Sequence, residues 1–345
     1  MSILEHPTRL SIAPVATDGR RSGRGVEDAP EEQPPSTGAK VATALIVGIP
    51  IAALFASIVV LWGSGIHLRD LGIAVALYVL TGHGVTVGFH RLLAHKALTV
   101  NRPLKVVLVA LGSMAYQGAP IGWVANHRRH HVLADTLTDP HSPQHHGRGP
   151  LGRVKGLWHA HVGWLFTYRG GCDRLAADLR TDPDLVRMNA LFPMWCVVSL
   201  ALPLALGWIV GGSFAAALGT FFWAGLVRVA LLHHVTWSVN SLCHMFGRRP
   251  FSTRDTSHNL RVLAVISMGE SWHNGHHAIP RSARHGLLRG QLDTSARLIR
   301  CFERVGWATE VRWPSSDDIG RRADTLASAH TAHQGESARG VVIGE

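Results

Sequence analysis

Three long stretches of the sequence contain no Asp, Glu, Lys or Arg: residues 41–68, 71–90 and 188–227. A helix of about 20 mainly apolar residues crosses a hydrocarbon core of about 30 Å. The third stretch is long enough for two such helices, so we expect four membrane-spanning helices, and an ordinary soluble enzyme is excluded. The expected spans are residues 41–62, 71–89, 189–210 and 213–232.

Short connections arrange these spans as two hairpins. Residues 63–70 join the first pair, and Gly211–Gly212 join the second, where glycine supplies the backbone angles of a tight turn. The apolar stretch Leu104–Trp123 is interrupted by three glycines and a proline, so we expect an interfacial or re-entrant helix there. Four crossings place both chain ends and residues 90–188 on one side of the membrane.

The charge distribution indicates which side this is. Lys and Arg number 34 against 23 Asp and Glu, and much of the excess of +11 lies in the long connections beside the apolar stretches. Cytoplasmic loops are enriched in Lys and Arg, so we expect a cell-membrane protein with both termini and the long connections in the cytoplasm. Lipid headgroups or an acidic ligand fit this charge. A nucleic-acid partner does not, because no basic run is interleaved with aromatic residues.

The two ends of the sequence are rich in polar and charged residues. Residues 1–40 lack the apolar core of a signal peptide, and we expect them and residues 314–345 to be disordered tails. Residues 41–313 are expected to form one membrane domain. The four cysteines show no CxxC spacing, so we expect reduced thiols.

The 23 histidines are clustered. His90 and His95 form an HxxxxH pair where the second span ends, and HxxHH triplets occur at residues 127–131 and 273–277. Positions i, i+3 and i+4 share one face of a helix, so each triplet can direct three imidazoles to one point. The pair at i and i+5 diverges on a regular helix, so we expect the helix end to unwind or the metal to lie beyond it.

Together with His244, one helical turn after Asn240, these clusters supply nine imidazoles, enough for two metal ions with four or five ligands each. Imidazole alone does not select among Fe, Cu, Zn and Ni. The expected fold is an all-α membrane protein with four transmembrane helices in two hairpins, capped by a cytosolic helical domain carrying a histidine-rich dimetal site. The candidate ligands are His90, His95, His127, His130, His131, His244, His273, His276 and His277.

Other polar residues receive plainer roles. Soluble di-iron bundles use two Glu-x-x-His strings, and this sequence has only Glu270–His273, so that class is excluded. His83 is expected to pack rather than to ligate, and His159 and His161 are weaker candidates for contacting the ligands from outside. The carboxylates expected to accept hydrogen bonds from imidazole N–H groups are Glu270, Asp135 and Asp139.

The order of the histidine boxes, with Asn-x-x-x-His before the last one, resembles the integral-membrane acyl-CoA (stearoyl-CoA) Δ9 desaturases, in particular the actinobacterial ones. The resemblance covers about residues 41–313. Further strings that carry it are Gly84-Val-Thr-Val-Gly-Phe-His-Arg, Trp123–His131, Asp139-Pro-His-Ser-Pro143, His161-Val-Gly-Trp164 and Trp237–His244.

The resemblance implies that the nine histidines hold two iron ions and that Asn240 reaches one of them through a water. It implies O2-dependent insertion of a cis double bond between C9 and C10 of a long saturated acyl-CoA, such as stearoyl- or palmitoyl-CoA. Gln117, Thr236 and Trp237 match positions at the bend of the family's substrate channel, where proximity selects one methylene pair. Arg169 matches a basic residue that binds the CoA headgroup.

Around the headgroup site the sequence departs from animal members, with Ala125, Asn126 and Tyr168 at positions that are charged there. Further basic candidates are Arg128, Arg129, Arg148, Arg153 and Lys155.

Each turnover needs two external electrons. The sequence has no cysteine set for an iron–sulfur cluster, so we expect a separate NAD(P)H-dependent reductase or a ferredoxin to supply them. Two alternatives stay open. The same centre could hydroxylate a lipid or alkane, or act on a carotenoid. A histidine-rich metal transporter or haem electron carrier is a different class, although a transporter would place its ligands near mid-span.

Overall fold

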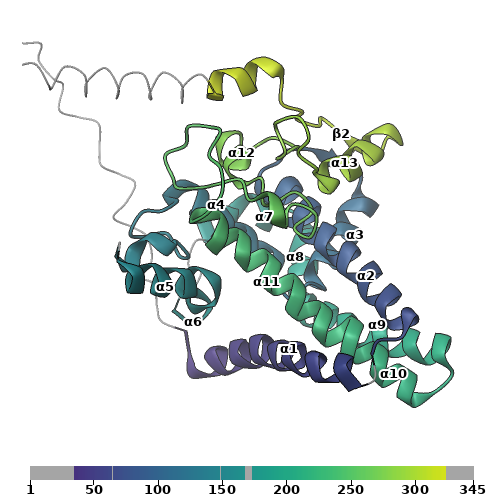
Figure 1. The fold of residues 1–345 in the computed structure, drawn as a ribbon. Coiled ribbons are helices and arrows are strands. Elements are labelled where there is room, and N and C mark those ends of the chain that lie inside the picture. The colour runs from purple at the N-terminus through teal and green to yellow at the C-terminus, as the bar shows by residue number, and fades with distance from the viewer. Residues whose placement is uncertain (1–34, 64, 148, 168–172, 324–345) are drawn as a thin grey trace, which may run out of the picture. The chain divides into compact units, whose positions relative to one another are not determined.

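The computed structural model describes residues 35–63, 65–147, 149–167 and 173–323, and most of these residues are helical (Figure 1). Within these ranges, four helical segments are long and apolar enough to cross a membrane: Thr37–Gly63, Leu68–Ala94, Phe192–Gly211 and Phe214–His244. They follow one another as two hairpins. The predicted all-helical membrane fold with four spans is therefore confirmed.

Two of the spans are regular and two contain wider turns. The first is α1 (Thr37–Gly63) and the third is α9 (Phe192–Gly211). The second consists of α2 (Leu68–His83) and a π-helix, η1 (Gly84–Ala94). The fourth consists of α10 (Phe214–Thr220), a π-helix η5 (Phe221–Val227), α11 (Arg228–Ser241) and a 3-10 turn η6 (Leu242–His244).

The second and fourth spans are longer than the sequence predicted. They have 27 and 31 residues, whereas about 20 residues suffice to cross the hydrocarbon core. The additional turns continue beyond the apolar part of each helix and carry His90 and His244. These two helices therefore connect the membrane part with the part that holds the histidines.

The second hairpin turns where the sequence predicted. Gly212 ends α9 with φ of 64°, a left-handed conformation that favours glycine. Ser213 then begins α10, and its side chain accepts a hydrogen bond from the backbone N–H of Ala216. Glycine termination followed by a serine N-cap fixes a turn of two residues between the spans.

The remaining elements form a cap at one end of the spans (Figure 1). Two described strands, β1 (Thr99–Val100) and β2 (Ala308–Thr309), pair antiparallel and connect the end of the second span with the C-terminal part. The helices of the cap are α3 (Arg102–Ser113), α4 (Pro120–Leu133), η2 (Pro143–His146), α5 (Pro150–Trp158), η3 (His159–Gly163), α6 (Trp164–Thr167), η4 (Asp173–Ala176), α7 (Ala177–Arg180), α8 (Pro183–Ala190), η7 (Arg261–Leu263), α12 (His273–Ala278) and α13 (Thr294–Arg304).

The apolar stretch at residues 104–123 is broken, as expected for a segment that does not cross the membrane. Helix α3 ends at Ser113, and α4 begins at Pro120. Between them the chain reverses through Tyr116 and Gly118, which have φ of 59° and 103°. The buried Arg228 guanidinium donates to the carbonyl oxygen of Met114, and His233 contacts the carbonyl oxygen of Tyr116.

Helix α3 lies unusually close to η1. A Cβ atom on Gly84 would lie 2.2 Å from the backbone nitrogen of Gly112, so both positions need glycine for this packing. Phe89 and Val109 are fully buried beside the contact, in the largest apolar cluster of the described chain. This packing fixes the helix that carries His90.

Parts of both expected tails are helical. Helix α1 begins at Thr37, within residues 1–40, and residues 316–323 are helical within residues 314–345. Ser315 and Asp318 exchange hydrogen bonds at the start of the second of these segments, as in an N-cap. Residues 1–34 and 324–345 lie outside the described residues.

Replacing Gly84 with alanine is expected to destabilise the protein by about 1–3 kcal/mol, because the added methyl group meets backbone that cannot move aside. The thermal unfolding of purified protein, followed by tryptophan fluorescence in detergent, measures this loss. Gly72→Ala is the matched control, because a Cβ on Gly72 meets nothing within 4 Å. Equal unfolding temperatures for the two variants would contradict the packing argument.

Candidate metal centre

The second span reaches the histidines through a π-helix. The backbone N–H of His95 donates to the carbonyl oxygen of His90, a bond of 3.0 Å across five residues. Such i+5 bonds widen the turn, so residues five apart lie above one another on the same side of the helix. The sequence analysis suggested that the helix end unwinds. In the structure it stays helical, and its turn becomes wider. Both imidazoles thereby point to one place.

Five histidines converge in the first group: His90, His95, His127, His131 and His276. Their ligand atoms all lie within 4.8 Å of one another. The Nε2 atoms of His95 and His127 are 2.7 Å apart, and the Nε2 of His276 lies 2.8 Å from that of His131 and 3.1 Å from that of His90. The group therefore has the size of a single coordination sphere.

Four histidines form the second group: His130, His244, His273 and His277. The Nε2 atoms of His244 and His273 are 3.0 Å apart. Helices α4 and α12 each contribute to both groups. On α4, His127 and His131 belong to the first group and His130 to the second. On α12, His276 belongs to the first group, and His273 and His277 belong to the second. The structure thus brings all nine predicted histidines together and divides them into five and four.

Carboxylates hold several of these imidazoles from outside. His130 Nδ1 lies 3.0 Å from Asp139, and His244 Nδ1 lies 3.0 Å from Asp135. His90 Nδ1 is hydrogen bonded to Glu270. These are the three carboxylates that the sequence assigned to this task.

This arrangement fits metal ions. An imidazole that donates its Nδ1 proton to a carboxylate presents an unprotonated Nε2 lone pair. Lone pairs that face one another at about 3 Å repel unless a cation lies between them. The Nε2 atoms of His130 and His277 are buried and have no hydrogen-bond partner among the described residues. Two clusters able to hold metal ions are therefore present, and imidazole suits iron among other transition metals.

Burial keeps five of the nine imidazoles in the protonation state that metal binding requires. It lowers the pKa of His95, His127, His131, His273 and His276 well below the usual value for histidine, so these rings are neutral at pH 7. Burial opposes ionisation of Asp135 and Asp139, but the facing His244 and His130 outweigh it, and the pKa of each carboxyl lies below its usual range.

The sequence analysis missed three residues of the site. Asp255 accepts a hydrogen bond of 2.8 Å from His277 Nδ1, the fourth carboxylate–imidazole pair. His141 lies against His130, with ring centroids 4.3 Å apart, and its position in the quoted string Asp139-Pro-His-Ser-Pro143 was the available signal. His285 lies 4.3 Å from His276 between ring centroids, and no box spacing marks it.

His285 belongs to a buried network beside the first group. Its Nδ1 lies 3.5 Å from Glu270, and neither ring nitrogen has a hydrogen-bond partner in the described part of the chain. Arg91 donates to Glu270 and to Asp293, each at 3.0 Å. This pairing compensates two buried carboxylates and fixes the one that holds His90.

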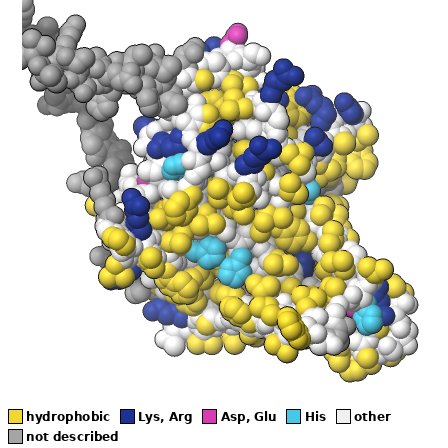
Figure 2. Space-filling model, in the orientation of Figure 1, with side chains coloured by type: hydrophobic (Ala, Val, Ile, Leu, Met, Phe, Trp, Pro, Cys, Tyr) yellow, Lys and Arg dark blue, Asp and Glu magenta, His cyan; other side chains and the backbone are white. Residues whose placement is uncertain are grey.

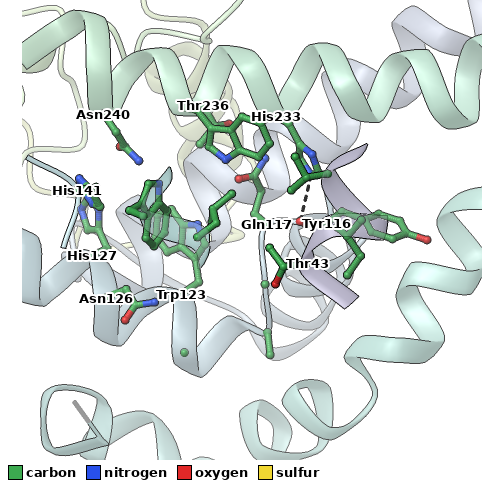
Figure 3. Close-up of a pocket in the computed structure, with 18 of the residues that line it drawn as sticks. Thr43, Tyr116, Gln117, Trp123, Asn126, His127, His141, His233, Thr236 and Asn240 are labelled. Atoms are coloured by element: carbon green, nitrogen blue, oxygen red, sulfur yellow. Dashed lines mark hydrogen bonds between the residues drawn. The ribbon is translucent and has the colours of Figure 1, made fainter. Parts of the chain in front are cut away.

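A cavity of about 340 Å³ extends from the histidines along α11 (Figure 3). All four residues predicted to shape the substrate channel or to contact a metal line it: Gln117, Thr236, Trp237 and Asn240. In Figure 3, Thr236 and Asn240 project from α11, and Trp123 and His127 project from α4 on the opposite side. A smaller cavity of about 50 Å³ shares Trp123, His127, Thr236 and Asn240, and His90, His130 and His273 also line it. Histidines of both groups therefore line the smaller cavity, which lies next to the larger one.

The residues predicted to bind the CoA headgroup do not form one group in the described structure. Arg169 and Tyr168, like Arg148, lie outside the described residues. Arg128 forms its hydrogen bonds within the protein. It donates to the carbonyl oxygens of Leu93 and Ala94 and pairs with Asp178 at 2.6 Å. Arg153 and Lys155 are exposed on α5.

Three histidines that the sequence analysis considered separately have partners outside the two groups. His83 Nδ1 contacts the carbonyl oxygen of Val79, as expected for packing. His159 contacts the carbonyl oxygen of Pro140, and His161 contacts Ser241 and His234. Neither of these two is a member of the described metal-binding groups.

Comparison with known proteins decides the family. The model of the family described as "Fatty acid desaturase" matches residues 71–291, which include every histidine of both groups. The chain belongs to the fatty acid desaturase family. A fatty acid desaturase of this architecture is an oxidoreductase of lipid metabolism, and the narrower resemblance to actinobacterial acyl-CoA enzymes goes beyond this match.

Several named desaturase relatives cover most of the chain. A hex-5-enoyl-[acyl-carrier protein] acetylenase of Moorena producens is 36% identical over 79% of this chain and 85% of its own length. An sn-1 stearoyl-lipid 9-desaturase of Anabaena variabilis is 36% identical over 79% of this chain and 93% of its own length. An acyl-CoA C20 Delta5-desaturase of Anemone leveillei is 35% identical over 78% of this chain and 80% of its own length.

Asp255→Asn is expected to weaken metal binding about 10- to 100-fold, because an amide orients His277 less firmly than a carboxylate. Metal content of purified protein, measured by mass spectrometry after dialysis against a graded series of chelator concentrations, reports this change. Asp317→Asn, an exposed aspartate of the C-terminal helical segment, is the control. Equal metal retention in the two variants would show that Asp255 does not support the site.

Proposed function

We propose that this protein is an O2-dependent Δ9 desaturase that inserts a cis double bond into a saturated long acyl chain, such as stearoyl or palmitoyl, with two iron ions in the two histidine groups. The observation that carries the proposal is that histidines of both groups line the smaller cavity, beside a larger cavity that shares four of its lining residues. A narrow cavity of this kind can bring one pair of methylenes next to both histidine groups.

The iron ions, when bound, would supply the oxidising power that removes two hydrogen atoms from adjacent methylenes. The protein's own residues position the chain. Trp123 and Trp237 give the larger cavity rigid walls, and Thr236 lines both cavities. Held in this geometry, one methylene pair reacts although its neighbours are chemically alike. Asn240, beside the second group, is proposed to hold a metal-bound water.

Gln117 is proposed to fix the bend of the path. It lines the larger cavity, and its Nε2 is buried without a partner among the described residues. The loop that carries it is held by Arg228 and His233. A side chain on an immobile loop can determine where an inserted chain must turn.

The acyl carrier proposed from the sequence is coenzyme A. The printed names of the relatives include a lipid-linked, an acyl-carrier-protein-linked and a CoA-linked substrate. Arg169, Arg153 and Lys155 are the proposed contacts for the negatively charged CoA headgroup. Purified enzyme supplied in turn with stearoyl-CoA, stearoyl-acyl-carrier protein and a stearoyl lipid distinguishes the carriers.

The proposal also covers the electron donor and the orientation of the protein in the membrane. A separate NAD(P)H-dependent reductase or a ferredoxin supplies two electrons for each double bond. The cap, the histidine groups and both termini face the cytoplasm, and the spans lie in the cell membrane. The support is that the connections with excess Lys and Arg lie on the cap side of four spans.

His276→Ala is expected to abolish desaturation, because His276 contributes to the first group and lies within 3.1 Å of two other candidate ligands. The fatty acids of host membranes, with double-bond positions mapped by mass spectrometry and with a reductase co-expressed, provide the measurement. His67→Ala is the matched control, since His67 is exposed between the first two spans.

The expected result is new cis Δ9 monoenes with the wild type and with His67→Ala, and none with His276→Ala. Hydroxy fatty acids in place of monoenes would favour the hydroxylase alternative. Undiminished monoenes with His276→Ala would refute the ligand assignment.

Gln117→Ala is expected to give a mixture of double-bond positions, because it widens the bend and lets the chain slide. Gln117→Leu keeps the volume of the side chain and is expected to preserve a single position at reduced yield. The same mapping of double bonds by mass spectrometry tests both. One unchanged position in both variants would exclude Gln117 from positioning.

A further inference from the structure

A groove of about 620 Å³ lies on the cap, outside the metal centre. Three exposed arginines line it, Arg248, Arg261 and Arg289, together with the apolar side chains of Val262 and Leu288. No Asp or Glu is among its described lining residues. The groove therefore combines concentrated positive charge with an apolar wall.

The positive charge of this region is not neutralised locally. Residues 245–291 contain seven arginines and two acidic residues. Both acidic residues are engaged at the metal centre, Asp255 with His277 and Glu270 with His90 and Arg91. None of the three arginines of the groove forms an ion pair with a described residue. An anionic ligand would neutralise the positive charge of these three arginines.

The segment that forms one wall of the groove exposes apolar side chains. Val262 is 81% exposed, Val265 is 63% exposed and Ile266 is 45% exposed. Three neighbouring aliphatic side chains in contact with water are unfavourable, by about 25 cal/mol for each Å² of apolar surface. Covering these three side chains with apolar material would therefore stabilise the protein.

The position of this segment identifies the covering material. The Tyr78 hydroxyl donates to the carbonyl oxygen of Ile266, at 2.7 Å. Tyr78 lies ten residues after Leu68, the start of the second span, or about 15 Å along the helix, within a hydrocarbon core of about 30 Å. Leu71, Val75 and Val79 form an exposed apolar stripe on the same helix. The bilayer that covers α2 at this level also reaches Ile266.

We propose that this groove binds an anionic phospholipid of the leaflet next to the cap. The phosphate lies among Arg248, Arg261 and Arg289, and the acyl chains cover Val262, Val265 and Ile266. In Figure 2 most of the visible Lys and Arg lie over the upper part of the molecule, and hydrophobic side chains are spread over the whole face. A headgroup with attached acyl chains matches a groove in which arginines adjoin apolar side chains.

An acidic soluble protein fits the observations less well. It would complement the arginines, but it could not reach aliphatic side chains that lie at the depth of a membrane span. A lipid bound there also supports the active site, because Ile266, Ser267 and Met268 line the smaller cavity from the inside. This lipid site is separate from the proposed desaturation, and both tests below measure it without measuring enzyme activity.

The first test measures the depth of Val262. A nitroxide on Val262→Cys, in a cysteine-free background of the full chain in lipid nanodiscs, is expected to be shielded from a water-soluble relaxation agent and accessible to O2. Val79→Cys on α2, at 42% exposure, is the membrane reference, and Leu137→Cys on the cap, at 88% exposure, is the aqueous reference. A label at 262 that behaves like the one at 137 overturns the proposal.

The second test measures lipid binding by native mass spectrometry. Protein in detergent is titrated with phosphatidylglycerol or phosphatidylcholine, and the wild type is expected to retain phosphatidylglycerol preferentially. Changing Arg248, Arg261 and Arg289 to Gln should raise its apparent Kd roughly fivefold for each arginine removed. The control changes three exposed arginines outside the groove, Arg174, Arg297 and Arg304, to Gln.

The outcomes of the second test separate the possibilities. Loss of preference in the groove variant alone supports the site. Equal loss in the control variant means that only the net charge matters, which overturns the proposal. Unchanged retention in the groove variant, or a groove that binds an added acidic protein and not phosphatidylglycerol, overturns it as well.

Discussion

The structure depends on the electrostatic problem of burying nine imidazoles whose ring nitrogens face one another. Such a cluster is stable only with a cation at its centre and with hydrogen-bond acceptors at its periphery. Glu270, Asp139, Asp135 and Asp255 provide four of these acceptors. These carboxylates come from three separate segments of the chain. The chain in the cap must therefore bring each carboxylate next to the Nδ1 atom of its histidine.

The membrane part serves the same requirement. Two spans carry none of the nine histidines, whereas the second and fourth continue into the turns that carry His90 and His244. The glycine contact between Gly84 and Gly112 brings α3 against η1, and the loop after α3 is fixed by Arg228 through carbonyl oxygens. This guanidinium, buried in a span without a carboxylate partner in the described part of the chain, is satisfied by three backbone carbonyls and the Ser199 hydroxyl. Its bond to Met114 holds the start of the loop that carries Gln117.

Much of this was predictable from the sequence, and the reasons for the failures are physical. Uncharged length predicts the four spans, and i, i+3, i+4 spacing predicts the triplets, because both properties are local. The π-helix at His90 and His95 was not predicted, since its i+5 bonds arise from tertiary packing around Gly84. The division of the histidines into five and four depends on how α4 faces α12, which spacing along the chain does not encode. Asp255 and His285 come from loops without a repeating pattern. The same holds for Arg128, whose partners are carbonyl oxygens far away in the sequence.

Helices α4 and α12 each supply ligands to both histidine groups. A rigid helix with side chains in two coordination spheres transmits the orientation imposed by one sphere to the other. A metal ion bound in the first group would therefore fix the rotation of both helices and lower the entropy cost of ordering the second group. Under the proposed function, binding of the two ions would then be cooperative, and a chain with a single ion would be scarce.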